Sequence, residues 1–230
     1  MSSVTNGPRS QVPAAGHKRQ TTRIVIAVVI ALIGVWFVLK PPFVVRSLPG
    51  HETAGDQPVE NKAATFVDGL WTKLVPLFED KAQDIAKVLP EMRADPDSAG
   101  QKYGRREATN PYNYMVKGTG KVTEINTTSA AGTALVEIPG LDEKVALQIG
   151  PVVRGTALRD ATGLVSFNQF SNQLDYADVS KEMNTRALNR VFASVPAASL
   201  VGKSVTFYGA FTFDPHSKSA VLITPVKISP

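Results

Sequence analysis

The stretch TALVEIPGLDEKVALQI (residues 133–149) contains two short apolar runs separated by turn-forming residues. Each run follows the period of two that is typical of a partly buried β-strand, which predicts strands at 133–138 and 144–149. Pro139 and Gly140 end the first run, and this pair of residues marks a turn. We therefore expect two consecutive strands at the centre of the fold.

The same period continues on both sides of this stretch. A first strand is expected over 112–125, where Gly118 and Gly120 predict a bulge or a sharp bend. Residues 164–167 are a candidate for a short fourth strand. The pattern is completed by an amphipathic helix at 174–193 and by two strands at 203–213 and 219–228, which a hairpin loop at 214–218 joins.

The order of these elements is three or four strands, one helix and two strands. This is the order of an OB-type barrel, in which the helix between the third and fourth strands plugs one end. The fold class that we predict is mainly β with helices (α+β), with the OB-like barrel at 105–230 and one long inserted helix.

A helical segment is expected to precede the barrel, at 61–104, and to pack on it. Apolar residues recur there at helical spacing from Phe66 to Leu89, and Pro76 is expected to separate or kink two helices. Pro90 and Pro96 are expected to limit the second helix. Trp71 lies on the apolar stripe and is interpreted as a core residue.

The amino-terminal part reads as a membrane anchor. Residues 24–39 (IVIAVVIALIGVWFVL) carry no charge, and a helix of this length spans roughly 24 Å, close to a hydrocarbon core of about 30 Å. We expect a basic cytoplasmic tail at 1–23, a single transmembrane anchor at 24–40 and a linker at 41–60. The alternatives are a cleaved secretory signal and a buried core helix, but no small-residue cleavage site follows Leu39.

The charge distribution supports this orientation and argues against nucleic acid as a partner. The chain has 230 residues and a net charge of +5, and residues 1–23 hold four basic residues and no acidic one. Residues 41–230 carry 20 basic and 20 acidic side chains, so the exported part has no excess of positive charge with which to bind phosphates. We expect a single-pass protein of the inner membrane with the bulk of the chain in the periplasm.

The densest group of polar residues lies at 149–179 (IGPVVRGTALRDATGLVSFNQFSNQLDYADV). Two arginines there can pair with the oxygens of a carboxylate or phosphate, and hydroxyl and amide groups surround them. The alternative is an internal brace, in which the arginines pair with Asp160 and Asp175. The candidate ligand-binding residues, for a small anionic or sugar-like solute, are Arg154, Thr156, Arg159, Asp160, Asn172, Gln173 and Tyr176.

No catalytic group can be assigned from the sequence. The three histidines, at positions 17, 51 and 216, lie in the tail, the linker and a hairpin loop, and there is no cysteine. We therefore expect no catalytic residues, no metal and no cofactor, and a binding or accessory role. The alternatives are an envelope hydrolase that uses Asp160, Asp175 or Tyr176, and a purely structural envelope protein.

The run Ile-Gly-Pro-x-x-Arg-Gly-Thr-x-x-Arg-Asp at 149–160 also carries a family resemblance. Together with 202–203, 208–211 and 224–226, it resembles the predicted periplasmic lipoproteins of the domain of unknown function 2291, over most of 65–228. Members of that family are often lipid-anchored and encoded near sugar-type ABC transporters, which implies a transporter subunit as a possible partner. This chain lacks the cysteine that lipidation needs, so the helix at 24–39 would replace the lipid.

Overall fold

The computed structural model describes residues 62–230. The tail, anchor and linker predicted at 1–23, 24–40 and 41–60 lie outside these residues. Within 62–230, no helix is both long enough and apolar enough to cross a membrane.

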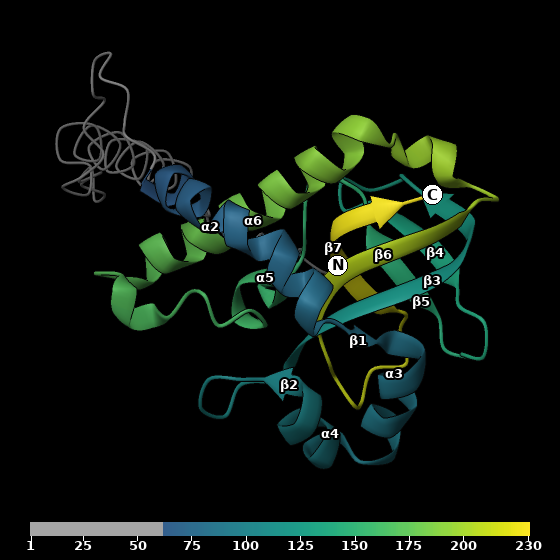
Figure 1. The fold of residues 1–230 in the computed structure, drawn as a ribbon, viewed down its shortest axis with the longest axis horizontal. Coiled ribbons are helices and arrows are strands. Elements are labelled where there is room, and N and C mark those ends of the chain that lie inside the picture. The colour runs from purple at the N-terminus through teal and green to yellow at the C-terminus, as the bar shows by residue number, and fades with distance from the viewer. Residues whose placement is uncertain (1–61) are drawn as a thin grey trace, which may run out of the picture. The chain divides into compact units, whose positions relative to one another are not determined.

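Five strands close into a barrel (Figure 1). β3 pairs with β4, β4 with β5, β5 with β7 and β7 with β6, and β6 returns to β3. All of these pairs are antiparallel except β5 and β7. The strands are β3 (Asn113–Asn126), β4 (Thr133–Glu137), β5 (Val145–Gln148), β6 (Ser204–Thr212) and β7 (Val221–Ser229), and the short β1 (Gln83–Asp84) and β2 (Gly104–Arg105) pair with β3.

This arrangement confirms the predicted α+β fold with an OB-like barrel. The inserted helix is α6 (Gln173–Ser194), within one residue of the prediction at each end. The candidate strand at 164–167 is wrong: the chain is irregular there and forms a short 3-10 turn at Phe167–Gln169. Val165 is buried in a hydrophobic core that helices and the outer side of the barrel share, so its burial does not require a strand.

Gly118 and Gly120 do not produce the expected bulge. β3 pairs with β6 without interruption from Asn113 to Lys121, and the irregularity falls later, between Val122 and Glu124 in the pairing with β4. A Cβ on Gly120 would lie 2.3 Å from the carbonyl oxygen of Glu137. The glycine is needed because the neighbouring strand comes too close for a side chain.

The helices before the barrel are α2 (Lys62–Lys81), α3 (Ile85–Ala94) and α4 (Pro96–Tyr103). α2 continues through Pro76 and α3 through Pro90, so neither proline divides or ends its helix as predicted. Pro96 limits α3 as predicted, because α3 ends at Ala94. Pro96 then stands at the first position of α4, where its missing N–H costs nothing. Trp71 is buried, as predicted.

The hydrophobic side chains form two cores. The first fills the barrel and includes four residues of α3 together with Val191 near the end of α6; the α3 residues are Ile85, Val88, Leu89 and Met92. The second lies between α2, the short α5 (Ala157–Asp160), α6 and the outer side of β6 and β7. α3 therefore shares the role of plug that the sequence assigned to the inserted helix alone.

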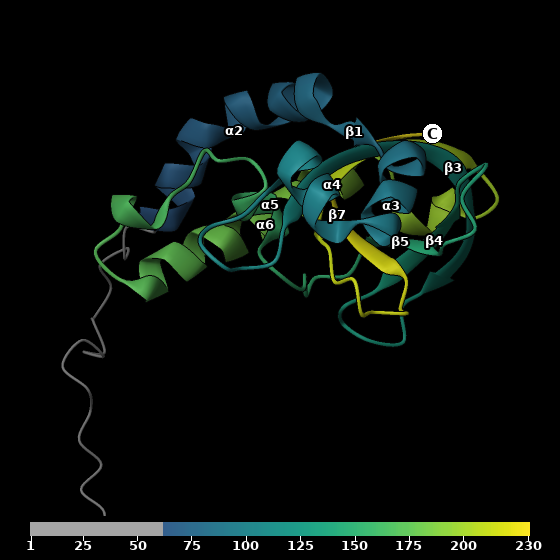
Figure 2. The same ribbon diagram turned by 90° about the horizontal axis from the view of Figure 1, so that it is seen from below.

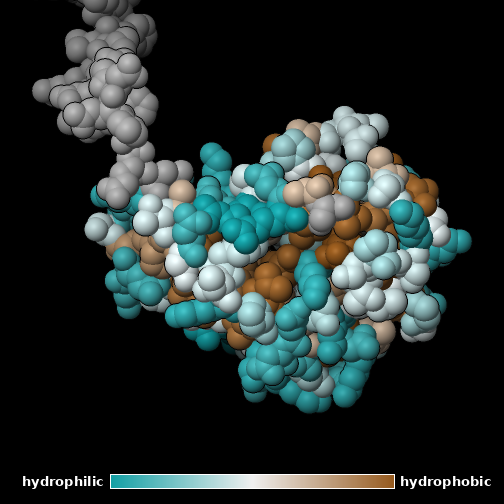
Figure 3. All heavy atoms as spheres, turned by 45° about the horizontal axis from the view of Figure 1, so that its top comes forward, coloured by the Kyte–Doolittle hydropathy of each residue, from teal (hydrophilic) through white to brown (hydrophobic). Residues whose placement is uncertain are grey.

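The two views of the ribbon show this division (Figures 1 and 2). α2 and α6 lie side by side on one flank of the barrel, and α3 and α4 pack against another part of it. On the face drawn in Figure 3, hydrophobic surface lies in a hollow bordered by hydrophilic side chains. Part of the apolar surface of this domain is thus open to solvent.

Candidate functional site

The segment after β5 is held against the barrel by one buried side chain. Gln148 is 1% exposed, and its amide nitrogen donates to the carbonyl oxygen of Arg154 at 3.0 Å and to the hydroxyl of Thr224 at 2.8 Å. Its amide oxygen accepts from the backbone N–H of Arg154 at 2.7 Å. Gly155 follows with a positive φ of 86°, which favours glycine and turns the chain toward α5.

Arg159, on α5, is buried and forms an internal brace. Its Nε donates to Asp160 Oδ1 at 2.7 Å, and its Nη1 donates to the carbonyl oxygen of Tyr176 at 2.9 Å. The guanidinium carbon lies 3.5 Å from the centre of the Tyr176 ring. One side chain therefore ties α5 to the first turn of α6 by an ion pair, a hydrogen bond and a cation–π contact.

Two further groups complete this brace. The Thr156 hydroxyl donates to Asp160 Oδ2 at 2.6 Å, and the Tyr176 hydroxyl donates to Asp160 Oδ1 at 3.3 Å. Burial raises the pKa of the Tyr176 phenol, the Arg159 guanidinium acts in the opposite direction, and the Asp160 carboxylate adds to the rise. Tyr176 thus stays a neutral hydrogen-bond donor at physiological pH.

Asn172 and Gln173 have local roles at the start of α6. Asn172 is the N-cap: its Oδ1 accepts from the backbone N–H of Asp175 at 2.9 Å, and its Nδ2 donates to the Asp175 carboxylate at 3.1 Å. Gln173 is exposed at the first position of the helix. Asp175 therefore belongs to the cap and does not pair with an arginine of the run at 154–159.

The structure separates the seven candidate residues into three groups. Thr156, Arg159, Asp160 and Tyr176 form the brace, and Asn172 and Gln173 begin α6. Arg154 is exposed and lines surface depressions beside β4 and β5. The internal pairing that we considered as an alternative is present for Arg159 with Asp160, and the two guanidinium groups do not share one pocket.

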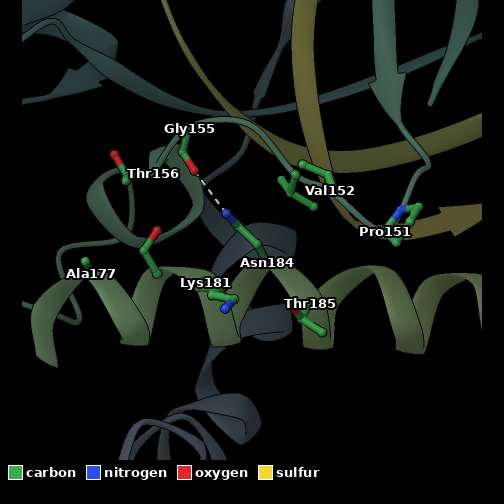
Figure 4. A pocket seen from close by; sticks show the side chains of 10 residues that line it. Pro151, Val152, Gly155, Thr156, Ala177, Lys181, Asn184 and Thr185 are labelled. Atoms are coloured by element: carbon green, nitrogen blue, oxygen red, sulfur yellow. Dashed lines mark hydrogen bonds between the residues drawn. The ribbon is translucent and has the colours of Figure 1, made fainter. Parts of the chain in front are cut away.

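A cavity lies between the loop before α5 and α6 (Figure 4). It has a volume of about 370 Å³. The loop wall is mostly apolar, and the helix wall is polar. The lining residues are Pro151, Val152, Val153, Gly155 and Thr156 on the loop, and Ala177, Ser180, Lys181, Asn184 and Thr185 on α6.

Two residues that line the cavity each have a buried side-chain oxygen with no hydrogen-bond partner in the described part of the chain. Ser180 is 3% exposed and Asn184 is 5% exposed. Asn184 Nδ2 donates to the carbonyl oxygen of Gly155 at 3.0 Å, as Figure 4 shows, but neither Asn184 Oδ1 nor Ser180 Oγ has a hydrogen-bond partner among the described residues. Leaving such a group unsatisfied costs about 1–3 kcal/mol, so two in one cavity require an explanation.

Sequence reasoning missed both residues. They lie four positions apart, one helical turn, beside the apolar residues Val179, Met183 and Ala187 on the buried side of α6. Their position as polar residues at the edge of the apolar stripe of the helix is the only feature of the sequence that points to them. Of the seven candidates, Thr156 alone lines this cavity.

A metal centre has no obvious ligands in this part of the chain. Within 62–230, no group of three or more histidine, cysteine, aspartate or glutamate side chains is placed to hold an ion. The site consists of a partly apolar cavity, with Lys181 as its one charged lining residue, beside the brace, and this arrangement suits binding of a small molecule.

The comparison with protein families covers nearly the whole chain. Residues 25–229 match the model of DUF2291, described as a predicted periplasmic lipoprotein. The chain belongs to this family. It is therefore a periplasmic protein associated with a membrane. The search of curated proteins found no match.

A solved structure supports the fold. The crystal structure of an OB-fold protein from Thermotoga maritima is similar to this chain with a TM-score of 0.61 and 21% sequence identity. The similarity covers 76% of this chain and 99% of the other. At this identity the likeness confirms the OB-fold and carries no information about a ligand.

Proposed function

We propose that this DUF2291 member is a tethered periplasmic binding protein without enzymatic activity, which holds a small solute in the cavity between α6 and the preceding loop. Residues 24–39 anchor the chain in the inner membrane in a single pass, with the amino-terminus in the cytoplasm. The domain assists a transporter of the same membrane, of the sugar ABC type. The anchor rests on the uncharged run of 16 residues and the basic tail before it.

The observation that carries the proposal is the pair of buried oxygens, Ser180 Oγ and Asn184 Oδ1. A ligand that places hydrogen-bond donors in the cavity satisfies both and removes the penalty of leaving them unpaired. Since the amide nitrogen of Asn184 already donates to Gly155, the amide oxygen of this residue remains as an acceptor only. The bound molecule must therefore present a donor to Asn184.

The two walls of the cavity define the class of solute. The polar wall offers the Ser180 hydroxyl, the Asn184 amide oxygen and the Lys181 ammonium at the rim. The opposite wall consists of Pro151, Val152 and Val153, which suit a C–H face. A monosaccharide or another polyol has hydroxyls on its edge and an apolar face, and it fits a cavity of about 370 Å³.

The carboxylates argue for a binding role over a hydrolytic one. Asp160 accepts hydrogen bonds from Arg159, Thr156 and Tyr176, and Asp175 is part of the N-cap of α6. Neither carboxylate lines the cavity. A pair of acids flanking a substrate, as glycoside hydrolysis requires, is therefore not available in this cavity.

Thermal unfolding of the full chain with a panel of pentoses, hexoses and polyols tests the proposal. At least one solute should raise the unfolding temperature in proportion to the logarithm of its concentration. Ser180→Ala should weaken the binding of that solute several-fold. Ser98→Ala, the same change on α4 away from the cavity, should leave the binding unchanged. If no solute stabilises the chain, or if both variants respond equally, the cavity is not the binding site.

The topology and the partner have separate tests. A periplasm-active reporter fused after Gly50 should be active, and a cytosolic reporter at the same position should be inactive. Copurification in mild detergent should recover ABC transporter subunits with the full chain. A cytosolic signal at Gly50 would contradict the proposed orientation without affecting the cavity.

A further inference from the structure

On the barrel, the exposed Arg154 lines a groove that is separate from the α6 cavity. The groove consists of two adjoining depressions of about 150 Å³ and about 260 Å³. Both are lined by Arg154, Asn126, Thr133 and Leu222, so they form one continuous surface over the ends of β3, β4, β5 and β7. From this geometry we infer a second binding site, which takes a single carboxylate or phosphate group on an otherwise uncharged, partly apolar solute.

The backbone of Arg154 is fixed while its side chain is not engaged. The buried Gln148 amide holds both the N–H and the carbonyl oxygen of this residue. Within 62–230, the Arg154 guanidinium makes no hydrogen bond and no ion pair, unlike that of Arg159. A guanidinium with free donors, carried on a fixed backbone, is suited to the paired oxygens of a carboxylate or phosphate.

The loop opposite Arg154 is also held in place. The backbone N–H of Val152 donates to the carbonyl oxygen of Ala130 at 3.0 Å, and that of Ile149 donates to Gly132 at 3.1 Å. These bonds connect the loop between β3 and β4 to the segment that carries Arg154. The smaller depression therefore has a defined shape before any ligand binds.

The polar groups of the smaller depression that remain available are mainly donors. Asn126 Oδ1 accepts from the backbone N–H of Thr128 at 3.0 Å and from its hydroxyl at 2.7 Å, which directs the amide nitrogen of Asn126 outward as a donor. The hydroxyls of Ser129 and Thr133 line the same depression. No acidic side chain lines it, so an anionic group meets a guanidinium, an amide N–H and two hydroxyls there.

The larger depression limits what can be attached to the anionic group. Its lining includes the apolar side chains Leu135, Ala146 and Leu222, and also Glu124. A second negative charge on the solute would be repelled by Glu124. The ligand should therefore carry one oxyanion, held at Arg154, and an uncharged apolar part that lies over Leu135 and Leu222.

Calorimetric titration of the full chain in phosphatidylcholine nanodiscs tests this inference, with acetate, hexanoate and inorganic phosphate as probes and empty nanodiscs as the reference. Hexanoate should bind saturably and more tightly than acetate, because its chain covers the apolar part of the groove. Arg154→Gln should weaken hexanoate binding by about 10–100-fold, the loss expected for charged hydrogen bonds. Arg106→Gln, the same change of charge at an exposed position on another part of the domain, should alter it less than about twofold.

Glu124→Gln provides an independent test of the charge argument. It should tighten hexanoate binding a few-fold, because it removes the one negative charge that lines the groove. Equal effects of Arg154→Gln and Arg106→Gln would overturn the site, as would the absence of saturable binding by all three probes. Phosphate binding that depends on Arg154, without hexanoate binding, would overturn the apolar part of the inference.

Discussion

Replacing Arg159 with alanine should destabilise the fold strongly, whereas the same change at Arg154 should not. The Arg159 guanidinium makes an ion pair with Asp160, a hydrogen bond to the Tyr176 carbonyl and a contact with the Tyr176 ring. Breaking a buried ion pair costs about 3–5 kcal/mol. The side chain of Asp160 is 20% exposed and keeps its hydrogen bond from the Thr156 hydroxyl. We therefore expect the free energy of unfolding to fall by about 3 kcal/mol, the lower end of this range.

Arg154→Ala is the matched control, since the two arginines lie in one run and only Arg159 is buried. It removes an exposed side chain and leaves the backbone hydrogen bonds to Gln148 in place, so the stability should change by less than about 0.5 kcal/mol. Urea unfolding of the full chain in detergent, followed by circular dichroism, measures both variants. A loss below about 1 kcal/mol for Arg159→Ala, or equal losses for the two variants, would refute the brace.

Three further predictions concern the stability of the domain. Gly69→Ala, at an exposed position inside α2 with open space around it, should raise the free energy of unfolding by about 0.5–1 kcal/mol. Gly120→Ala should lower it, because a Cβ there meets a carbonyl oxygen at 2.3 Å. Thermal unfolding measures both variants. Asn172→Ala removes the N-cap of α6 and should cost about 1 kcal/mol in urea unfolding, with Asn172→Asp retaining most of it. Burial raises the pKa of Tyr114 to about 12, so the unfolded chain releases this proton first and stability should fall as the pH rises from about 10 toward 12. Tyr114→Phe should reduce that fall and leave stability at pH 7 unchanged or slightly higher, because the buried hydroxyl has no partner among residues 62–230; an unchanged alkaline slope would contradict the assignment.

The barrel could be predicted from the sequence because its strands carry apolar residues at a period of two and are bounded by turn residues. Pro139 and Gly140 end one strand region, and the hairpin loop between β6 and β7 contains Asp214 and Pro215. The inserted helix was equally clear from its periodicity. Local patterns of this kind determine which element forms, and the order of the elements then restricts the topology.

The surfaces that these elements cover could not be predicted in the same way. The apolar stripe of α3 predicts a helix, but only the structure places Ile85 and Leu89 in the barrel core. The periodicity of a helix does not determine which of two neighbouring hydrophobic cores its apolar face packs into. The same limit applies to α6, which contributes Met183 to the core beside α2 and Val191 to the barrel.

The candidate residues of the segment 149–179 lie in separate surroundings in the structure. Spacing along the sequence placed Arg154 and Arg159 together, whereas the positive φ of Gly155 and the short α5 send them to different surroundings. Ser180 and Asn184 carry no motif, so their importance became visible only from burial and missing partners. Sequence patterns report residue type and period, and the satisfaction of a buried polar group depends on tertiary contacts.

The proposed binding site can be tested by a crystal structure of the chain grown with the solute that stabilises it best. We expect the solute in the α6 cavity, with donors about 2.7–3.2 Å from Ser180 Oγ and Asn184 Oδ1 and its apolar face against Val152 and Val153. A solute bound elsewhere, or a closed cavity in which both oxygens are hydrogen-bonded to groups of the protein, would contradict it.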